Sequence, residues 1–151
     1  MKKITFLLFL ILININLFGQ KQHSKDEKII KNLIINSFDD LFSNLSTKNI
    51  EQYFTKDFIL LENGEVWNSD TLTVHFEKTR LKKVIPKREN KFEFIEIKID
   101  GNMAWAAYHN YATLSIEDDI IRKIHWLESA TIISTKNGWK IQMMHSTRLK
   151  E

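Results

Sequence analysis

The distribution of apolar residues predicts helices in the first half of the chain and strands in the second. From residue 29 to residue 45, apolar positions recur every three or four residues, which is the spacing of one face of an α-helix. These positions are Ile29, Ile30, Leu33, Ile34, Phe38, Leu41, Phe42 and Leu45. We therefore expect one amphipathic helix over about 25–45. A second, short helix is predicted to begin after Thr47 and to end near Phe54, with Ile50, Tyr53 and Phe54 on its buried side.

Turn signals divide the rest of the chain. Asn63-Gly64 is a strong hairpin signal, so 57–67 is predicted to form a short strand pair. Ser69 or Asp70 can cap a third helix that runs to about Lys83 and is closed by Pro86. Long segments with strand character follow at 91–99, 103–116, 120–135 and 139–149, separated by tight polar turns. Helices followed by turn-linked strands predict an α+β domain in which the helices cover one face of an antiparallel sheet.

The first nineteen residues have the pattern of a secretory signal. Lys2 and Lys3 provide a positive start, and fifteen mostly apolar residues, 4–18, lead to Gly19. Such a segment is short for a membrane-spanning helix of about 20 residues. We expect cleavage after Gly19, a single domain over 20–151, and export to the periplasm or the medium without a stable membrane anchor. An uncleaved N-terminal anchor is the alternative.

Composition excludes several classes of function. The sequence has no cysteine, which excludes disulfides, thiol catalysis and zinc–thiolate sites. The full chain has 22 Lys and Arg against 19 Asp and Glu, a net charge of +3. Removal of the two signal lysines leaves 20 against 19, or +1, so composition does not support nucleic-acid binding. The cationic run from Lys78 to Arg88 is predicted to be a solvated helix end and loop rather than an anion site.

Several local patterns, in their order along the chain, resemble the nuclear transport factor 2-like superfamily and its SnoaL-like and DUF4440-type branch. They are Tyr53–Phe58 followed by Asn63-Gly64, then 100–105, Trp126–Thr131, and 138–141 followed by His145-Ser146-Thr147. The resemblance covers essentially all of 24–149. It implies a cone, in which a strongly curved sheet wraps around a long helix and leaves a pocket at its open end. Members include isomerases, dehydratases, cyclases and ligand-binding proteins, so the fold alone does not decide the function.

Two residues are the main candidates for chemistry. By strict alternation, His145 shares a face of the last strand with Trp139, Ile141 and Met143, and the resemblance places it near the cavity. Glu128 interrupts the apolar row that Trp126 and Ala130 form on the preceding strand, and a buried carboxylate needs a partner. We therefore predict a Glu128–His145 pair capable of acid–base work. The alternatives are a structural His145 bonded to a backbone carbonyl, a structural ion pair, or an outward-facing Glu128 with Ser129 and Thr131 inside.

Further residues are predicted to line the pocket without a catalytic role. Trp126 and Met143 are predicted to line it, together with Tyr108 and Tyr53. His109 lies on the opposite face of its strand from Tyr108, and either face could line the cavity. No group of histidines has metal-ligand spacing, so we expect neither a metal nor a cofactor.

Three functions are consistent with these features. The leading prediction is an exported protein whose pocket binds a small, mostly apolar molecule. The first alternative is a proton-transfer enzyme, an isomerase, dehydratase or hydrolase, which uses the Glu128–His145 pair. The second is a homodimeric interaction module that associates through the exposed sheet face. The sequence names no substrate for any of them.

Overall fold

A computed structural model describes residues 24–150, and the predicted signal segment 1–19 therefore lies outside the described residues. Residues 24–37 are α-helical and continue into a π-helical turn, η1 (Phe38–Ser43). The other helices are α2 (Ile50–Tyr53) and α3 (Ser69–Arg80). The strands are β1 (Phe54–Glu62), β2 (Glu65–Trp67), β3 (Lys87–Asp100), β4 (Met103–Ile116), β5 (Asp119–Thr135) and β6 (Gly138–Arg148). Within residues 24–150, no helix is both long enough and apolar enough to cross a membrane.

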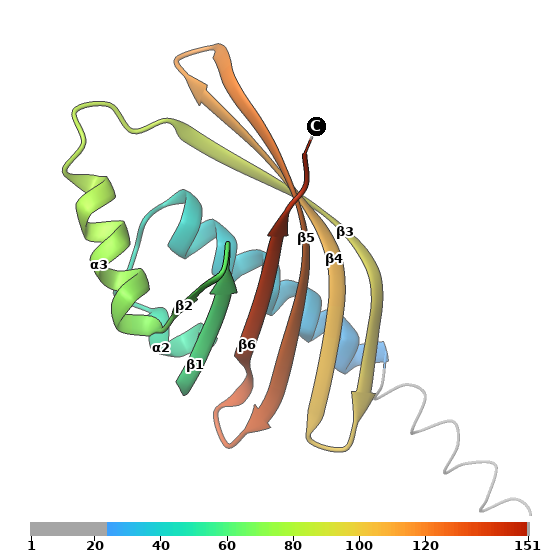
Figure 1. The fold of residues 1–151 in the computed structure, drawn as a ribbon. Coiled ribbons are helices and arrows are strands. Elements are labelled where there is room, and N and C mark those ends of the chain that lie inside the picture. Colours follow the sequence, from blue (N-terminus) through green and yellow to red (C-terminus); the bar gives the residue numbers. More distant parts are fainter. Residues whose placement is uncertain (1–23, 151) are drawn as a thin grey trace, which may run out of the picture.

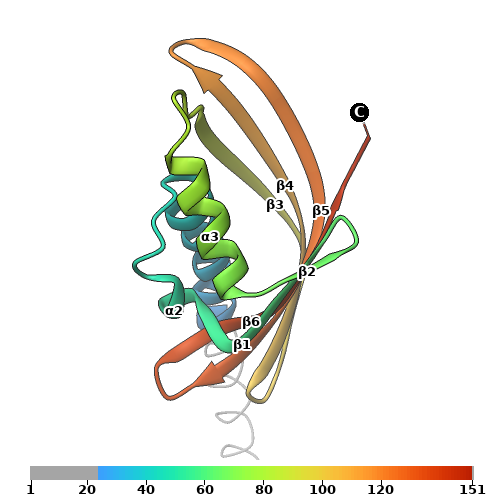
Figure 2. The same ribbon diagram turned by 60° about the vertical axis from the view of Figure 1, so that its left-hand side comes forward.

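The strands form one six-stranded sheet in the order β2-β1-β6-β5-β4-β3. All the helices lie on one side of this sheet, and its long strands curve over them (Figures 1 and 2). The predicted α+β architecture with a curved sheet is confirmed. The sheet is mixed rather than purely antiparallel, because the last strand, β6, inserts beside β1 in the same direction.

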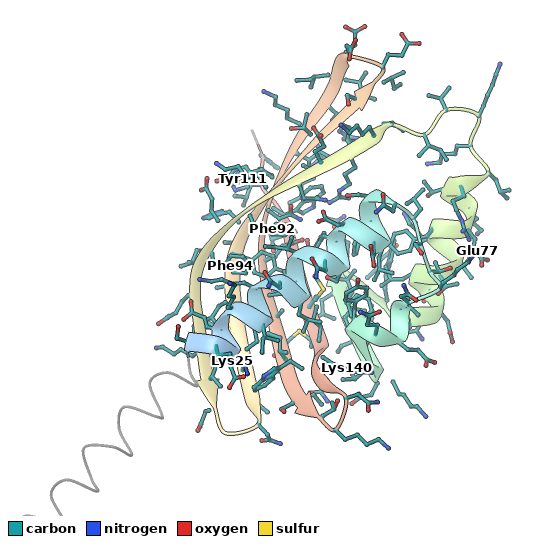
Figure 3. The ribbon with its side chains drawn as sticks, turned by 180° about the vertical axis from the view of Figure 1, so that it is seen from behind. Lys25, Glu77, Phe92, Phe94, Tyr111 and Lys140 are labelled. Atoms are coloured by element: carbon teal, nitrogen blue, oxygen red, sulfur yellow. The ribbon has the colours of Figure 1, made fainter. Side chains whose placement is uncertain are left out.

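The core lies between the first helix and the inner face of the sheet. The predicted apolar stripe supplies Ile30, Ile34, Phe38 and Leu41, all almost fully buried. Figure 3 shows this helix lying across the sheet, with Phe92 and Phe94 of β3 beside it. The predicted helix to residue 45 is wrong in its last turns, because the segment widens into η1, where Asn44 N–H donates to Asp39 O at 2.9 Å. That wider turn forms one end of the pocket described below.

Helix α3 begins at Ser69, and its cap lies one residue before the first of the two predicted caps. Asn68 is the cap, and its Oδ1 accepts a hydrogen bond from Thr71 N–H at 2.9 Å. Leu72 and Phe76 are the buried residues of α3, which ends at Arg80 rather than near Lys83. The helix therefore covers the end of the sheet formed by β1 and β2 (Figure 1).

Two irregularities change which side chains face inward. In β3 the register shifts between Phe94 and Glu96, so Ile95 is an extra residue and is exposed. In β6 the pairing with β5 skips Gln142, which reverses the alternation beyond it. The buried residues of β6 are consequently Ile141, Met144 and Ser146.

Candidate functional site

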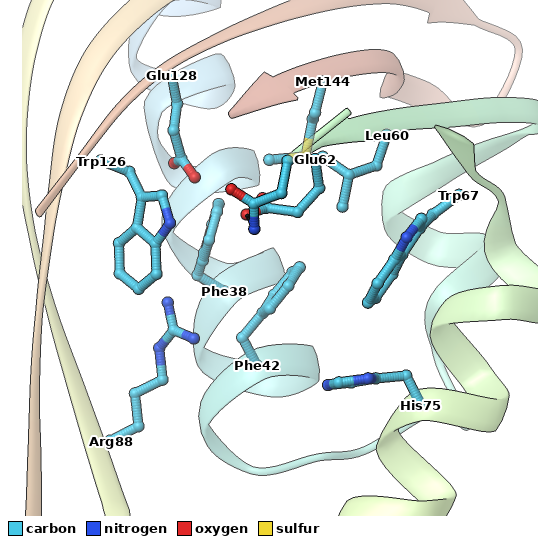
Figure 4. A pocket seen from close by; sticks show the side chains of 11 residues that line it. Phe38, Phe42, Leu60, Glu62, Trp67, His75, Arg88, Trp126, Glu128 and Met144 are labelled. Atoms are coloured by element: carbon cyan, nitrogen blue, oxygen red, sulfur yellow. Dashed lines mark hydrogen bonds between the residues drawn. The ribbon is translucent and has the colours of Figure 1, made fainter. Parts of the chain in front are cut away.

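A cavity of about 240 Å³ lies between η1, α3 and the inner face of the sheet. Its walls come from segments far apart in the sequence, and Figure 4 shows their side chains converging. The lining residues are Phe38, Phe42, Leu60, Glu62, Asn63, Trp67, His75, Arg88, Trp126, Glu128 and Met144. The cavity is therefore rich in aromatic side chains and also holds two carboxylates and one guanidinium.

The polar end of the cavity is built by register across four strands. Glu62 of β1 pairs with Ser146 of β6, Ser146 pairs with Glu128 of β5, and Glu128 pairs with Tyr108 of β4. Cross-strand partners point to the same face of a sheet. Ser146, Glu128 and Tyr108 are buried, so a continuous polar row runs beneath the first helix.

Glu128 is buried but incompletely neutralised. The Ser146 hydroxyl donates to Oε1 at 3.0 Å, and Asn110 Nδ2 donates to Oε2 at 3.3 Å. Burial raises the pKa of Glu128 to about 7, because these two hydrogen bonds and the charge of Arg88 offset only part of the desolvation. Burial also raises the pKa of Glu62. Near neutral pH, Glu128 can therefore either hold or release a proton.

Two buried polar atoms beside Glu128 have no hydrogen-bond partner of regular geometry among the described residues. They are the hydroxyl of Tyr108 and Oδ1 of Asn110, and both residues are fully buried. Burial, followed by the nearby charge of Glu128, raises the pKa of the Tyr108 hydroxyl well above its usual range. A protonated Glu128 can donate a hydrogen bond, and Asn110 Oδ1 is an acceptor beside it. The row can thus hold a proton or bind a polar group.

Arg88 is the cation of the cavity. Its Nε donates to Asn90 Oδ1 at 2.9 Å, and Asn90 Nδ2 donates to Ser43 Oγ at 2.8 Å, which anchors the side chain to η1. The guanidinium carbon lies 5.1 Å from the centre of the Trp126 ring, a cation–π contact. Burial lowers the pKa of Arg88, while the charges of Glu128 and Glu62 oppose that shift.

The terminal nitrogens of Arg88 remain available to a ligand. No ion pair links Arg88 to Glu62 or Glu128 in the part of the chain that the structure describes. Figure 4 shows the guanidinium pointing toward the two carboxylates from the opposite wall. A hydrogen-bonding group placed between them can meet an acceptor on one side and a donor on the other.

Aromatic rings form the remaining walls. Phe38 and Phe42 stack at 4.6 Å between ring centres, and Trp67 and His75 lie 5.1 Å apart at the β2–α3 end. Burial, followed by the charges of Lys82 and Lys78, lowers the pKa of His75. These rings present flat apolar surface to the cavity.

The predicted contact between Glu128 and His145 is wrong. Glu128 faces inward as expected, but it pairs with Ser146, and His145 is exposed on the outer face. The cause is the irregularity at Gln142, which carries both Met143 and His145 to the side away from the helices. Met143 therefore does not line this cavity, and Met144 takes the place predicted for it.

The other predicted pocket residues differ in their placement. Trp126 lines the cavity, and Tyr108 lies behind Glu128 without lining it. Tyr53 is buried elsewhere and donates its hydroxyl hydrogen bond to Asp40 Oδ2. Burial and this bond raise the pKa of Tyr53 to about 12.

In residues 24–150, no group of three or more His, Asp or Glu side chains is arranged to hold a metal ion.

Glu62 and Arg88 were not among the residues predicted from sequence. Glu62 continues the inward alternation of Phe58 and Leu60, and Arg88 continues that of Phe92 and Asn90. Extending the period-two pattern to the strand ends would have identified both. Arg88 was instead assigned to the solvated cationic run, since charge runs are usually exposed.

Comparison with known proteins supports the fold. No protein-family model matches the chain, and no curated protein sequence matches it significantly. Solved structures do match: an NTF2-like protein with a cystatin-like fold from Novosphingobium aromaticivorans has a TM-score of 0.72 and 12% identity, over 89% of each chain. An NTF2-like superfamily protein from Salmonella enterica has a TM-score of 0.68 and 18% identity, over 85% of this chain and 94% of that one.

A candidate ketosteroid isomerase from Shewanella frigidimarina is a third similar structure. It has a TM-score of 0.56 and 16% identity, over 77% of this chain and 92% of that one. The protein therefore has the nuclear transport factor 2-like fold, as the resemblance implied. The narrower SnoaL-like and DUF4440-type assignment stays a prediction.

Proposed function

We propose that the protein binds a small, mostly apolar, uncharged molecule in this cavity, through a single hydroxyl or carbonyl group. The observation that supports this most strongly is the arrangement of Arg88 opposite Glu62 and Glu128 within an aromatic enclosure. Typical sites for drug-sized ligands have volumes of roughly 300–1,000 Å³. A cavity of about 240 Å³ favours a ligand of one or two rings.

The charges of the site favour a neutral ligand. An anion would approach Glu62 and Glu128, and a cation would approach Arg88, so either charge would meet a like-charged group in a partly dehydrated space. A hydroxyl group can accept from the guanidinium and donate to a carboxylate. Aromatic walls then hold the rest of the molecule by burying its apolar surface.

Three probes with the same ring system test this preference: naphthol, naphthoate and naphthylmethylammonium, each titrated by calorimetry at neutral pH. We expect naphthol to bind at least about tenfold more tightly than either ion, equivalent to roughly 1.4 kcal/mol. Trp126→Ala should weaken naphthol binding, whereas Trp105→Ala, on the outer face, should leave it unchanged. Tighter binding of either ion, or no binding of naphthol, would overturn the proposal.

Proton transfer is the second candidate function, and the pKa of Glu128 favours it. A general base works best when its pKa lies near the working pH, and that of Glu128 is about 7. The charge of Glu62 contributes to raising the pKa of Glu128, and the charge of Glu128 in turn contributes to raising the pKa of the Tyr108 hydroxyl. The similarity in fold to a candidate ketosteroid isomerase agrees with chemistry of this kind.

Exchange of the acidic carbon-bound protons of tetralone in heavy water tests this candidate. A proton-transfer enzyme should accelerate exchange, measured by NMR, and Glu128→Gln should abolish the acceleration. Exchange at the rate of buffer alone would reject the catalytic role. Binding of naphthol in the same sample would leave the ligand-binding proposal intact.

Export to the periplasm or the medium is also proposed, on the strength of the signal pattern in residues 1–19. Mass spectrometry of the protein from those fractions should give a chain that begins at Gln20. A chain that keeps its first residues in the membrane fraction would instead support the uncleaved anchor.

A homodimer is proposed on the outer sheet face, which carries exposed large apolar side chains. Among them are Ile95, Met103, Trp105 and Leu127. Sedimentation over a range of concentrations tests this: a monomer throughout would reject it.

A further inference from the structure

A pair of histidines lies on the face of the sheet opposite to the cavity. His109 of β4 and His125 of β5 are half-buried, and His109 Nδ1 lies 2.8 Å from His125 Nε2. His109 pairs with Leu127, and Tyr111 pairs with His125, so the two histidines are diagonal neighbours across the strands. Their side chains alternate with the inward-facing Tyr108 and Asn110, which separates this pair from the ligand site.

The surroundings hold the two rings in place. Tyr111 stacks on His125 at 4.1 Å between ring centres, with an angle of 21° between the planes. On the other side, Glu93 of β3 is the cross-strand partner of His109. Glu93 forms an ion pair with Lys91 at 2.7 Å, and the Tyr111 hydroxyl lies 3.4 Å from its other oxygen. The pair is thus supported by two rigid central strands and by an acidic neighbour.

We propose that His109 Nδ1 and His125 Nε2 form a two-histidine site for a divalent transition-metal ion, with Cu²⁺ bound most tightly. Imidazole nitrogens bind such ions at about 2.0–2.1 Å. Two nitrogens at right angles around the ion are then about 2.8–3.0 Å apart, whereas a tetrahedral arrangement separates them by about 3.3 Å. The observed 2.8 Å matches the right-angled arrangement of square-planar or octahedral ions.

Coordination needs a change of tautomer in one ring and a turn of the two rings, so that both lone pairs point to one ion beside the line between the nitrogens. In the His109–His125 hydrogen bond, one ring donates its N–H to the lone pair of the other. When the donor ring carries its proton on the other nitrogen instead, both facing nitrogens present lone pairs to one ion, and the total number of protons on two neutral rings is unchanged. Protonated imidazole cannot coordinate, so binding must weaken as the pH falls.

The remaining coordination positions are left to water. No third His, Asp or Glu completes a metal-binding group in residues 24–150, although the charge of Glu93 favours a cation nearby. Two lysines disfavour a cation there: Lys91 lies on the same strand as Glu93, and Lys123 lies two residues before His125 on β5. An open two-ligand site selects by the intrinsic affinity order of the ions, which places Cu²⁺ above Ni²⁺ and Zn²⁺.

Titration of the full chain with Cu²⁺ tests the proposal, with calorimetry for affinity and electron paramagnetic resonance for the ligands. We expect a site with two nitrogen ligands that takes Cu²⁺ more tightly than Ni²⁺ or Zn²⁺. His109→Ala and His125→Ala should each lower its affinity by about tenfold or more, because each removes the chelate. His145→Ala is the matched control, since His145 is exposed on the same face and has no histidine partner within residues 24–150.

Equal Cu²⁺ affinity in the wild type and the His109→Ala/His125→Ala double variant would overturn the proposal, and so would loss of the site in His145→Ala. If an alanine variant does not fold, as judged by circular dichroism, His109→Gln and His125→Gln replace it. These retain a polar side chain but cannot supply the imidazole. Naphthol binding should be the same with and without Cu²⁺, which separates this site from the cavity.

Discussion

Replacement of Glu128 by glutamine is expected to remove a large pH-dependent part of the stability of the protein. Glu128 has a pKa of about 7 in the folded protein, against an ordinary value of 4.5. Because the folded-state pKa is raised, the group contributes stability fully below pH 4.5 and loses that contribution as the pH rises through 7. The wild type should therefore lose roughly 3 kcal/mol more than Glu128→Gln between pH 4 and pH 9.

Urea unfolding of both proteins across this pH range measures the difference, since groups that titrate independently of Glu128 cancel. Glu93→Gln is the control on the outer face. Lys91 lowers the pKa of Glu93, so the wild type should lose more stability than Glu93→Gln as the pH falls, which is the opposite of the trend expected for Glu128. Equal pH dependence in the wild type and Glu128→Gln would show that the Glu128 carboxylate lies in water.

Replacement of Phe58 by alanine is expected to destabilise the protein by about 3–5 kcal/mol. Phe58 is 1% exposed, and its ring stacks on Phe54 with 3.8 Å between centres. The variant would leave a cavity beneath the helices. Denaturant unfolding measures the loss.

Ile59→Ala provides the matched control from the same strand. Ile59 faces outward and is 39% exposed, so its truncation should cost less than about 1 kcal/mol. Similar losses for the two variants would contradict the orientation of β1, and with it the inward position of Glu62.

The sequence predicts most of the fold because the helical periodicity of its first half and the strand periodicity of its second half are both strong. The helical stripe around Ile30 and Ile34, and the Asn63-Gly64, Asp100-Gly101 and Asn137-Gly138 turns, correspond to elements of the structure. The sequence does not predict the insertion of β6 beside β1, because parallel pairing between distant strands leaves no local pattern in the sequence. The π-helical turn was missed for a related reason, because Phe38, Leu41 and Phe42 fit an α-helical stripe equally well.

The candidate site was predictable only in part. Glu128 was found because a single carboxylate in an apolar row is conspicuous, and the regular pairing of β5 with β4 keeps that row inward. His145 was misplaced because one skipped residue, Gln142, reverses every side chain after it. No residue type marks such an irregularity in advance. Glu62 and Arg88 line the site through tertiary contacts. The strand periodicity predicts that both side chains face inward, whereas their charge predicts that they are exposed.

The four tryptophans report directly on whether the cavity is the ligand site. Trp67 and Trp126 line it, Trp105 lies on the outer face, and Trp139 lies 3.5 Å from Asp26 at the start of the first helix. Their indole N–H signals can be assigned by single Trp→Phe variants and followed by NMR during addition of naphthol. We predict that the signals of Trp67 and Trp126 move while those of Trp105 and Trp139 stay fixed. Movement of Trp105 or Trp139 alone, or of none of the four, would contradict the proposed ligand site.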